Sequence, residues 1–163
     1  MISVIIPTYN EVANVDILYL QVTKVMNKLG SYEIIFVDDG SNDGTFRKIE
    51  ELHKRDKRVK AIRFRRNFGQ TAAIDAGLRH ANGDIIITMD ADLQNDPADI
   101  PDLLDKLKEG YDLVNGWRFK RKDKLFSKKI PSLVSNILVR KLTKVNLHDQ
   151  GCTLRAVRKE AVK

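Results

Sequence analysis

Short apolar strands alternate with helical patterns along most of the chain, and this alternation limits the possible folds more than any other feature. Apolar segments of strand character lie at 3–6, 32–37, 59–63, 85–89 and 113–116. Segments with helical apolar spacing lie between them, at 15–29, 45–55, 70–81 and 100–109. Because strands that are apolar throughout are buried on both faces, the pattern predicts an α/β domain with a mainly parallel sheet flanked by helices. Pro7 is expected to end the first strand, since proline lacks the N–H group.

Loops after the first four predicted strands are the expected location of a site, because ligands of parallel α/β sheets bind at the carboxyl ends of the strands. These loops are 7–11, 38–41, 65–70 and 90–94. The last one carries two carboxylates, Asp90 and Asp92, directly after an apolar run. If the extended geometry continues past Met89, both side chains point the same way. They can then hold one Mg²⁺ or Mn²⁺ ion, with the amide oxygen of Gln94 as a further ligand.

For an isolated Asp-x-Asp the alternative is a polar loop, so its neighbours at the same edge matter. A second acidic turn, Asp38 and Asp39, can accept hydrogen bonds from a base or ribose, although such a turn also serves as a helix cap. Arg66 could reach a diphosphate, and Gly69 would let the backbone approach the ligand. The glycine-rich fingerprints of dinucleotide and P-loop ATP sites are absent, which disfavours both.

Length and composition predict one folded domain spanning residues 1–163, with 42% hydrophobic and 31% charged residues. No apolar run approaches the ~18 residues of a membrane span, and a chain that opens directly in a strand leaves no room for a signal peptide. Cys152 is the only cysteine, so no disulfide framework is expected. These features predict a cytoplasmic location.

The positive charge is concentrated in residues 117–163, which hold 14 Lys and Arg and 3 acidic residues, against 15 and 19 in residues 1–116. Apolar side chains recur every three or four residues over 125–145, interleaved with Lys and Arg. The pattern predicts a C-terminal basic amphipathic helix, which can either lie in a membrane interface or pack against the domain. Nucleic-acid binding is not expected, because this region holds only three aromatic residues, Trp117, Phe119 and Phe126.

Five motifs occur in the order typical of one family: IIPTYNE at 5–11, VDDGS at 37–41, Asn67-x-Gly69, MDADLQxxP at 89–97 and Gly116-x-Arg118. On these motifs, which span practically the whole chain, the sequence resembles the family 2 glycosyltransferases. It is most similar to the polyprenyl-phosphate branch, which includes dolichol-phosphate mannose synthases and bacterial undecaprenyl-phosphate glycosyltransferases.

This resemblance implies a Rossmann-like GT-A fold and an inverting transfer from a UDP- or GDP-linked sugar to a polyprenyl phosphate. The residues implied at the base and ribose of the donor are Pro7, Tyr9, Glu11, Asp38 and Ala91, with Asp39 close by. The implied metal ligands are Asp90, Asp92 and Gln94, and the metal is Mg²⁺ or Mn²⁺.

Residues 117–163 are implied to form the acceptor and membrane-facing part, while residues 1–116 bind the nucleotide sugar. Arg118 would hold the acceptor phosphate, and Asp149 lies in a segment that resembles the family's late motif near the transferred sugar. That segment departs from the mannose-synthase form at Gly151, Cys152 and Thr153, which favours the bacterial branch.

Because an acceptor phosphate is already anionic, Asp149 is expected to orient substrate rather than remove a proton. The predicted catalytic residues are therefore Asp92, Arg118 and Asp149. The enzyme is expected to work at the cytoplasmic face of a membrane.

Two alternatives remain open. A soluble family 2 glycosyltransferase with a saccharide or protein acceptor would need a general base to deprotonate a hydroxyl. A receiver-like signalling domain would have its acid pair after the first strand, where this chain has Pro7, Thr8, Tyr9 and Asn10.

Overall fold

The structure, a computed structural model, describes residues 1–116 and 153–162 and contains a six-stranded sheet within them. The strands are β1 Ile2–Thr8, β2 Tyr32–Asp38, β3 Val59–Arg63, β4 Ile85–Thr88, β5 Leu113–Asn115 and β6 Arg155–Arg158. The helices are α1 Val15–Met26, α2 Thr45–Arg55, α3 Gln70–His80 and α4 Ile100–Lys108, with 3₁₀ turns η1 Pro97–Asp99 and η2 Lys159–Ala161.

Strands follow the order β3-β2-β1-β4-β6-β5 across the sheet. The first four are parallel to one another, and β6 is antiparallel to both β4 and β5. The prediction of a mainly parallel α/β sheet is therefore confirmed. The sequence reasoning missed β6, because only Ala156 and Val157 are apolar in this strand and an arginine flanks them on each side.

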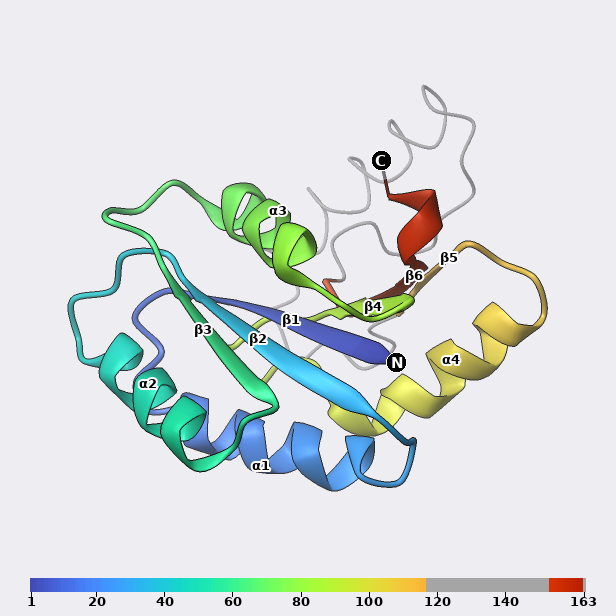
Figure 1. Cartoon of the computed structure of the whole chain (residues 1–163), viewed down its shortest axis with the longest axis horizontal. Helices are drawn as coiled ribbons and strands as arrows, with labels where there is room; N and C mark the ends of the chain where they lie inside the picture. Colours follow the sequence, from blue (N-terminus) through green and yellow to red (C-terminus); the bar gives the residue numbers. More distant parts are fainter. Residues whose placement is uncertain (117–152, 163) are drawn as a thin grey trace, which may run out of the picture.

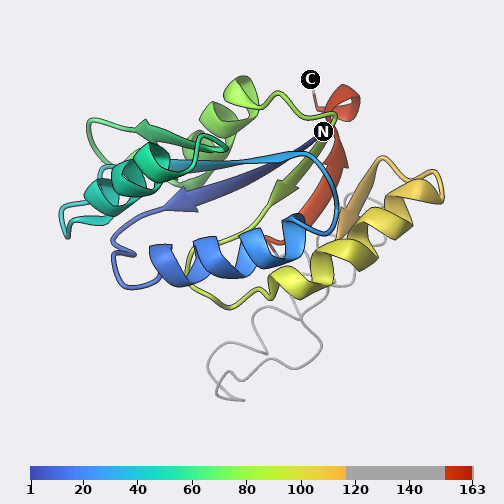
Figure 2. The same cartoon turned by 60° about the horizontal axis from the view of Figure 1, so that its bottom comes forward.

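Helices cover both faces of the sheet, with α1, α2 and α4 on one face and α3 on the other (Figures 1 and 2). Alternating side chains of one strand supply both cores: Val4 and Ile6 pack with the α1 side, while Ile5 packs with Ala73 of α3. All four residues are fully buried. Burial on both faces explains why the central strands are apolar at nearly every position.

The first strand continues through Pro7 to Thr8, so the prediction that Pro7 ends it is wrong. The backbone carbonyl of Thr8 accepts a hydrogen bond from the Asp39 N–H on the β2 side. The backbone carbonyl of Ile5 accepts one from the Met89 N–H on the β4 side. Pro7, two residues after Ile5, faces the β4 side beyond the last residue of β4. No ladder hydrogen bond is lost there, which is the condition under which a strand tolerates proline.

Among the helices of residues 1–116 and 153–162, none has both the length and the apolar character needed to cross a membrane. The predicted amphipathic helix over 125–145, Arg118 and Asp149 lie outside the described residues.

Candidate active site

A pocket of ≈ 330 Å³ opens at the carboxyl ends of the parallel strands. Loops after β1, β2, β3 and β4 line it, as expected from the sequence. The lining residues are Pro7, Thr8, Tyr9, Glu11, Asp39, Asn67, Gly69, Gln70, Asp90, Ala91 and Asp92.

Asp39, in the first acidic turn, holds the neighbouring loop in place. Its carboxylate accepts the backbone N–H groups of Phe68 at 2.7 Å and Gly69 at 2.9 Å, and its side chain is almost fully buried. Hydrogen bonds to a charged acceptor are about twice as strong as neutral ones. Asp39 therefore fixes the shape of the pocket wall that precedes α3, in addition to lining the pocket.

Asp38 is fully buried, and its two carboxylate oxygens differ. Oδ1 accepts the Ser41 N–H at 3.3 Å, whereas Oδ2 has no hydrogen-bond donor among the described residues. The nearest cation to Oδ2 is the Arg63 guanidinium, with its Nε at 3.7 Å. A buried acceptor without a donor is costly, so a donor group on a ligand that reached this oxygen would be stabilised.

Gly40 brings the first acidic turn against the loop after β3. Its φ of +77° lies in the left-handed region, and a Cβ at this position would come within 2.5 Å of the Arg66 carbonyl carbon. Only glycine meets both conditions without strain. The two loops can therefore form a continuous pocket wall.

Asp90, in the second acidic turn, is held by two side chains from distant segments. Its Oδ1 accepts Nε2 of Gln70 at 2.6 Å, and its Oδ2 accepts Oγ1 of Thr153 at 2.6 Å. Asp92 lies beside it on the pocket wall, and its Oδ1 accepts the Gln94 N–H at 3.0 Å. The second turn thus presents two carboxylates that side-chain and local backbone donors hold.

The route of the chain through this turn differs from a continued strand. β4 ends at Thr88, and Leu93 has a φ of +60°, so the extended geometry does not persist. Asp90 and Asp92 still line one pocket, whereas the Gln94 side chain is exposed and is not part of the lining. Gln94 as a metal ligand stays a prediction.

Hard carboxylate oxygens on an open wall suit a divalent cation that also takes oxygens from a substrate diphosphate. Within residues 1–116 and 153–162, no group of three or more His, Cys, Asp or Glu side chains is arranged to hold a metal. The donor set of Asp90 and Asp92 fits Mg²⁺ or Mn²⁺ that also takes oxygen atoms from its ligand.

The other predicted donor-site residues take different positions. Tyr9 is half-exposed in the pocket wall, and the Glu11 carboxylate accepts the Asn14 side-chain amide at 2.5 Å. Gly69 lines the pocket with a φ of +94°. Arg66 is exposed outside the lining, with its guanidinium 4.9 Å from the centre of the Phe68 ring.

Thr8, Asn67, Gln70 and Thr153 are at this site but were not identified as site residues by sequence reasoning, and Gln70 and Thr153 contact Asp90. Thr153 lies 63 positions after Asp90, and Gln70 lies 20 positions before it. Nothing in the residue spacing links them. The signal that could have found Thr153 was its position in the late segment that resembles the family motif.

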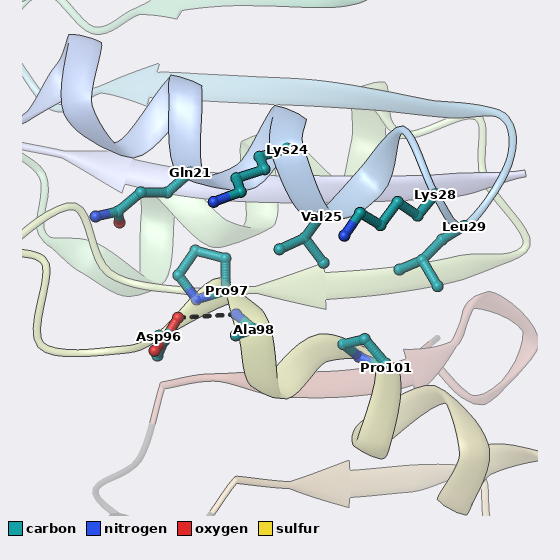
Figure 3. A pocket seen from close by; sticks show the side chains of 9 residues that line it. All are labelled: Gln21, Lys24, Val25, Lys28, Leu29, Asp96, Pro97, Ala98 and Pro101. Carbon is teal, nitrogen blue, oxygen red and sulfur yellow. Dashed lines mark hydrogen bonds between the residues drawn. The ribbon is translucent and has the colours of Figure 1, made fainter.

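A second pocket, of ≈ 380 Å³, lies between the C-terminal half of α1 and the segment from η1 into α4 (Figure 3). Lys24 of α1 and Lys28, two residues beyond the end of α1, lie opposite Pro97 and Pro101. It shares no residue with the pocket at the sheet edge. Although it is slightly larger, it lacks the paired carboxylates, so the chemistry favours the pocket at the sheet edge.

Two solved structures with the same architecture are a synthase and a mannosyltransferase. Glucosyl-3-phosphoglycerate synthase from Mycobacterium tuberculosis, in complex with Mn²⁺, UDP and phosphoglyceric acid, superimposes with a TM-score of 0.74 at 22% identity, over 98% of this chain and 56% of that one. A mannosyltransferase from Pyrobaculum calidifontis, in complex with GDP-Man and Mn²⁺, gives 0.63 at 24% identity, over 98% and 44%. The fold is the GT-A fold, as predicted.

The family model described as glycosyl transferase family 2 matches residues 3–163, and the chain belongs to this family. Dodecaprenyl-phosphate galacturonate synthase from Rhizobium johnstonii is 42% identical over 99% of this chain and 49% of its own length. Undecaprenyl-phosphate 4-deoxy-4-formamido-L-arabinose transferase from Pseudomonas aeruginosa is 42% identical over 99% and 48%. The resemblance to the polyprenyl-phosphate branch is thereby confirmed. The chain spans about half the length of these curated relatives.

Proposed function

We propose that this chain is the catalytic part of an inverting glycosyltransferase that moves a sugar from a UDP- or GDP-linked donor to a polyprenyl phosphate. The observation that carries the proposal is the pocket at the sheet edge, with Asp90 and Asp92 on its wall. The names of the curated relatives support a polyprenyl-phosphate acceptor. The complexes of the solved relatives with Mn²⁺ and UDP or GDP-Man support a metal-dependent nucleotide-sugar donor.

The donor's base and ribose would lie against Pro7, Tyr9 and Glu11 of the lining. Asp38, which is fully buried and outside the lining, would accept a hydrogen bond from them. The unsatisfied Oδ2 of Asp38 supports this assignment, because the N–H and O–H groups of a nucleoside are donors of the kind that it lacks.

At the other end of the pocket, Asp90, Asp92 and Gln94 would hold the cation, with Ala91 beside the ribose. A bound divalent cation supplies positive charge that stabilises the departing diphosphate. Asp39 keeps the loop that carries Gly69 in position, and Arg66, which lies on the same loop, would turn towards the diphosphate. These residues together hold the donor while its sugar stays open to attack.

The acceptor phosphate would bind to Arg118, and Asp149 would orient it behind the anomeric carbon. An anionic phosphate oxygen attacks without loss of a proton, so alignment takes the place of a strong general base. Residues 117–163 hold 14 Lys and Arg against 3 acidic residues, whereas residues 1–116 hold 15 against 19, so the net positive charge lies in the last third of the chain. A basic segment there would bring this part of the protein to the anionic cytoplasmic face of a membrane, where the acceptor lipid lies.

A donor screen tests the proposal directly. UDP- and GDP-sugars are incubated with undecaprenyl phosphate in vesicles and Mn²⁺ or Mg²⁺, and both nucleoside diphosphate release and glycolipid are measured. We expect one donor to give both products, and a chelator to abolish them. Transfer to a saccharide or protein with none to the lipid would support the soluble alternative. No product from any donor, together with no metal-dependent nucleotide binding, would refute the enzyme assignment.

A further inference from the structure

Thr153 connects the last part of the sheet to the second acidic turn. It lies two residues before β6, and the Thr88 hydroxyl of β4 donates to its backbone carbonyl at 2.8 Å. Its own hydroxyl donates to Oδ2 of Asp90 at 2.6 Å. The residue is thus held by its main chain while its side chain reaches the candidate metal site.

The direction of the Thr153 hydroxyl is set by a second contact. Nδ2 of Asn95 donates to Thr153 Oγ1 at 3.0 Å, and Asn95 is only 6% exposed. Because the amide is the donor in this bond, the hydroxyl hydrogen remains available for Asp90. A directed chain therefore runs from Asn95 through Thr153 to Asp90, and it favours one orientation of the Asp90 carboxylate.

Gln70 and Thr153, the two side chains whose bonds to Asp90 are described above, are electrically neutral. Gln70 donates an amide N–H to Oδ1, and Thr153 donates a hydroxyl to Oδ2. A lysine or arginine in either place would orient the carboxylate but would also cancel its charge. A neutral donor orients a carboxylate without adding positive charge, and a carboxylate with about four lone-pair sites can accept two such bonds and still bind metal.

We propose that Thr153 is a positioning residue for the donor site: its hydroxyl fixes the Asp90 carboxylate in the orientation that receives the divalent cation of the nucleotide sugar. This inference rests on the proposed function. It extends that function by tying the late segment of the chain to the Asp-x-Asp motif through one side chain. Partners of metal-binding carboxylates typically change metal affinity about 10–100-fold when they are removed.

Mn²⁺ affinity in the presence of UDP or GDP, measured by calorimetry without any turnover, tests this role. We expect Thr153→Val, which keeps the shape and removes the hydroxyl, to weaken Mn²⁺ binding by about tenfold or more. Thr153→Ser should keep the Mn²⁺ affinity within about twofold of wild type, because serine retains a hydroxyl that can donate to Asp90. In turnover assays the loss should appear in the Mn²⁺ concentration needed for half-maximal rate, with kcat at saturating Mn²⁺ affected less.

Thr88→Val is the matched control, because it removes a hydroxyl bond from the same pair of segments without touching Asp90. We expect near-wild-type Mn²⁺ affinity for it, even if it lowers the unfolding midpoint in EDTA as much as Thr153→Val does. If Thr153→Val does not fold, Thr153→Ala supplies the same readout.

Two results would overturn the positioning role: wild-type Mn²⁺ affinity in Thr153→Val, or an equal loss of affinity in Thr88→Val. Failure of wild-type protein to bind Mn²⁺ with either nucleotide would instead refute the proposed function, and the role of Thr153 would fall with it.

Discussion

The two acidic turns look alike in the sequence, and the structure gives them different surroundings. Asp38 and Asp39 at the end of β2 are buried, and backbone N–H groups hold them. Asp90 and Asp92 after β4 are partly exposed in the pocket wall, and Asp90 is held by side chains. The first turn therefore shapes the pocket, whereas the second presents negatively charged carboxylates to a ligand in the pocket.

The type of hydrogen-bond donor that each carboxylate accepts explains the difference. Backbone N–H groups belong to loops, so a carboxylate that accepts them ties loop conformations to the sheet, and its loss affects folding. Side-chain donors orient a carboxylate without fixing the backbone. We therefore expect loss of the Asp39 carboxylate in the first turn to affect stability most and substitutions in the second turn to affect metal-dependent activity, and four predictions test that division.

The largest effect is expected from Asp92→Asn. It removes a negative charge from the candidate metal site but keeps an oxygen that can accept the Gln94 N–H. Loss of several kcal/mol of charge stabilisation should lower kcat/KM by about 10²–10³-fold, with an unchanged unfolding midpoint. Asp96→Asn is the control, since its carboxylate makes the same local bond, to the Ala98 N–H at 2.9 Å, outside this pocket. Equal activity in the two variants would contradict the assignment of Asp92.

Asp39→Asn should have the next largest effect, and chiefly on stability. The amide can accept only one of the two N–H groups that Asp39 now accepts. Loss of a charge-assisted hydrogen bond, with one N–H left unpaired, should cost about 1.5–3 kcal/mol of unfolding free energy. Urea unfolding measures this loss.

Asp75→Asn is the control for Asp39→Asn, because Asp75 is an exposed partner of Arg79 on α3. It should leave the urea midpoint unchanged. If Asp39→Asn were as stable as wild type and had lost its Mn²⁺ dependence, the two turns would not differ as described.

Much of this arrangement was accessible from the sequence, because apolar periodicity encodes which faces are buried. The strands at 32–37 and 59–63 and the helix at 45–55 were predicted almost to the residue. The position of the pocket followed from the parallel topology, since the ends of parallel strands share one edge.

The partners of each carboxylate were not accessible, because they come from segments far along the chain. Asp39 binds N–H groups 29 and 30 residues away, and Asp90 binds a hydroxyl 63 residues away. Periodicity states which face a residue occupies, but it does not state which donor lies opposite. The division of labour between the two turns therefore needed the structure.

Asp38→Asn should have a smaller effect, divided between binding and stability. The Oδ2 atom of Asp38 is buried without a hydrogen-bond donor among the described residues, so a neutral side chain relieves part of that cost. We expect the unfolding free energy to change by less than about 1 kcal/mol. UDP or GDP affinity should fall about tenfold, the equivalent of one hydrogen bond to a charged group. A large loss of stability with unchanged nucleotide affinity would assign Asp38 to the fold alone.

Glu33→Gln should have the smallest effect on the site, since Glu33 lies near the start of β2, at the opposite end of the sheet. Burial raises the pKa of Glu33, but the Lys60 ammonium, the Asn82 N–H and the Ser3 hydroxyl outweigh it and hold the pKa below its ordinary value of 4.5. Because the folded pKa is depressed, this carboxylate contributes stability above about pH 4.5 that is lost as pH falls through the folded pKa.

Glu33→Gln should therefore flatten the fall in unfolding free energy below pH 4.5, measured by urea titration at several pH values, and leave Mn²⁺ and nucleotide affinity at the wild-type level. The result separates two explanations of the candidate site. If the total negative charge of the domain attracted the cation, removal of any buried carboxylate would weaken metal binding. If the geometry of the second turn does so, Glu33→Gln and Asp92→Asn will differ in Mn²⁺ affinity although each removes one charge.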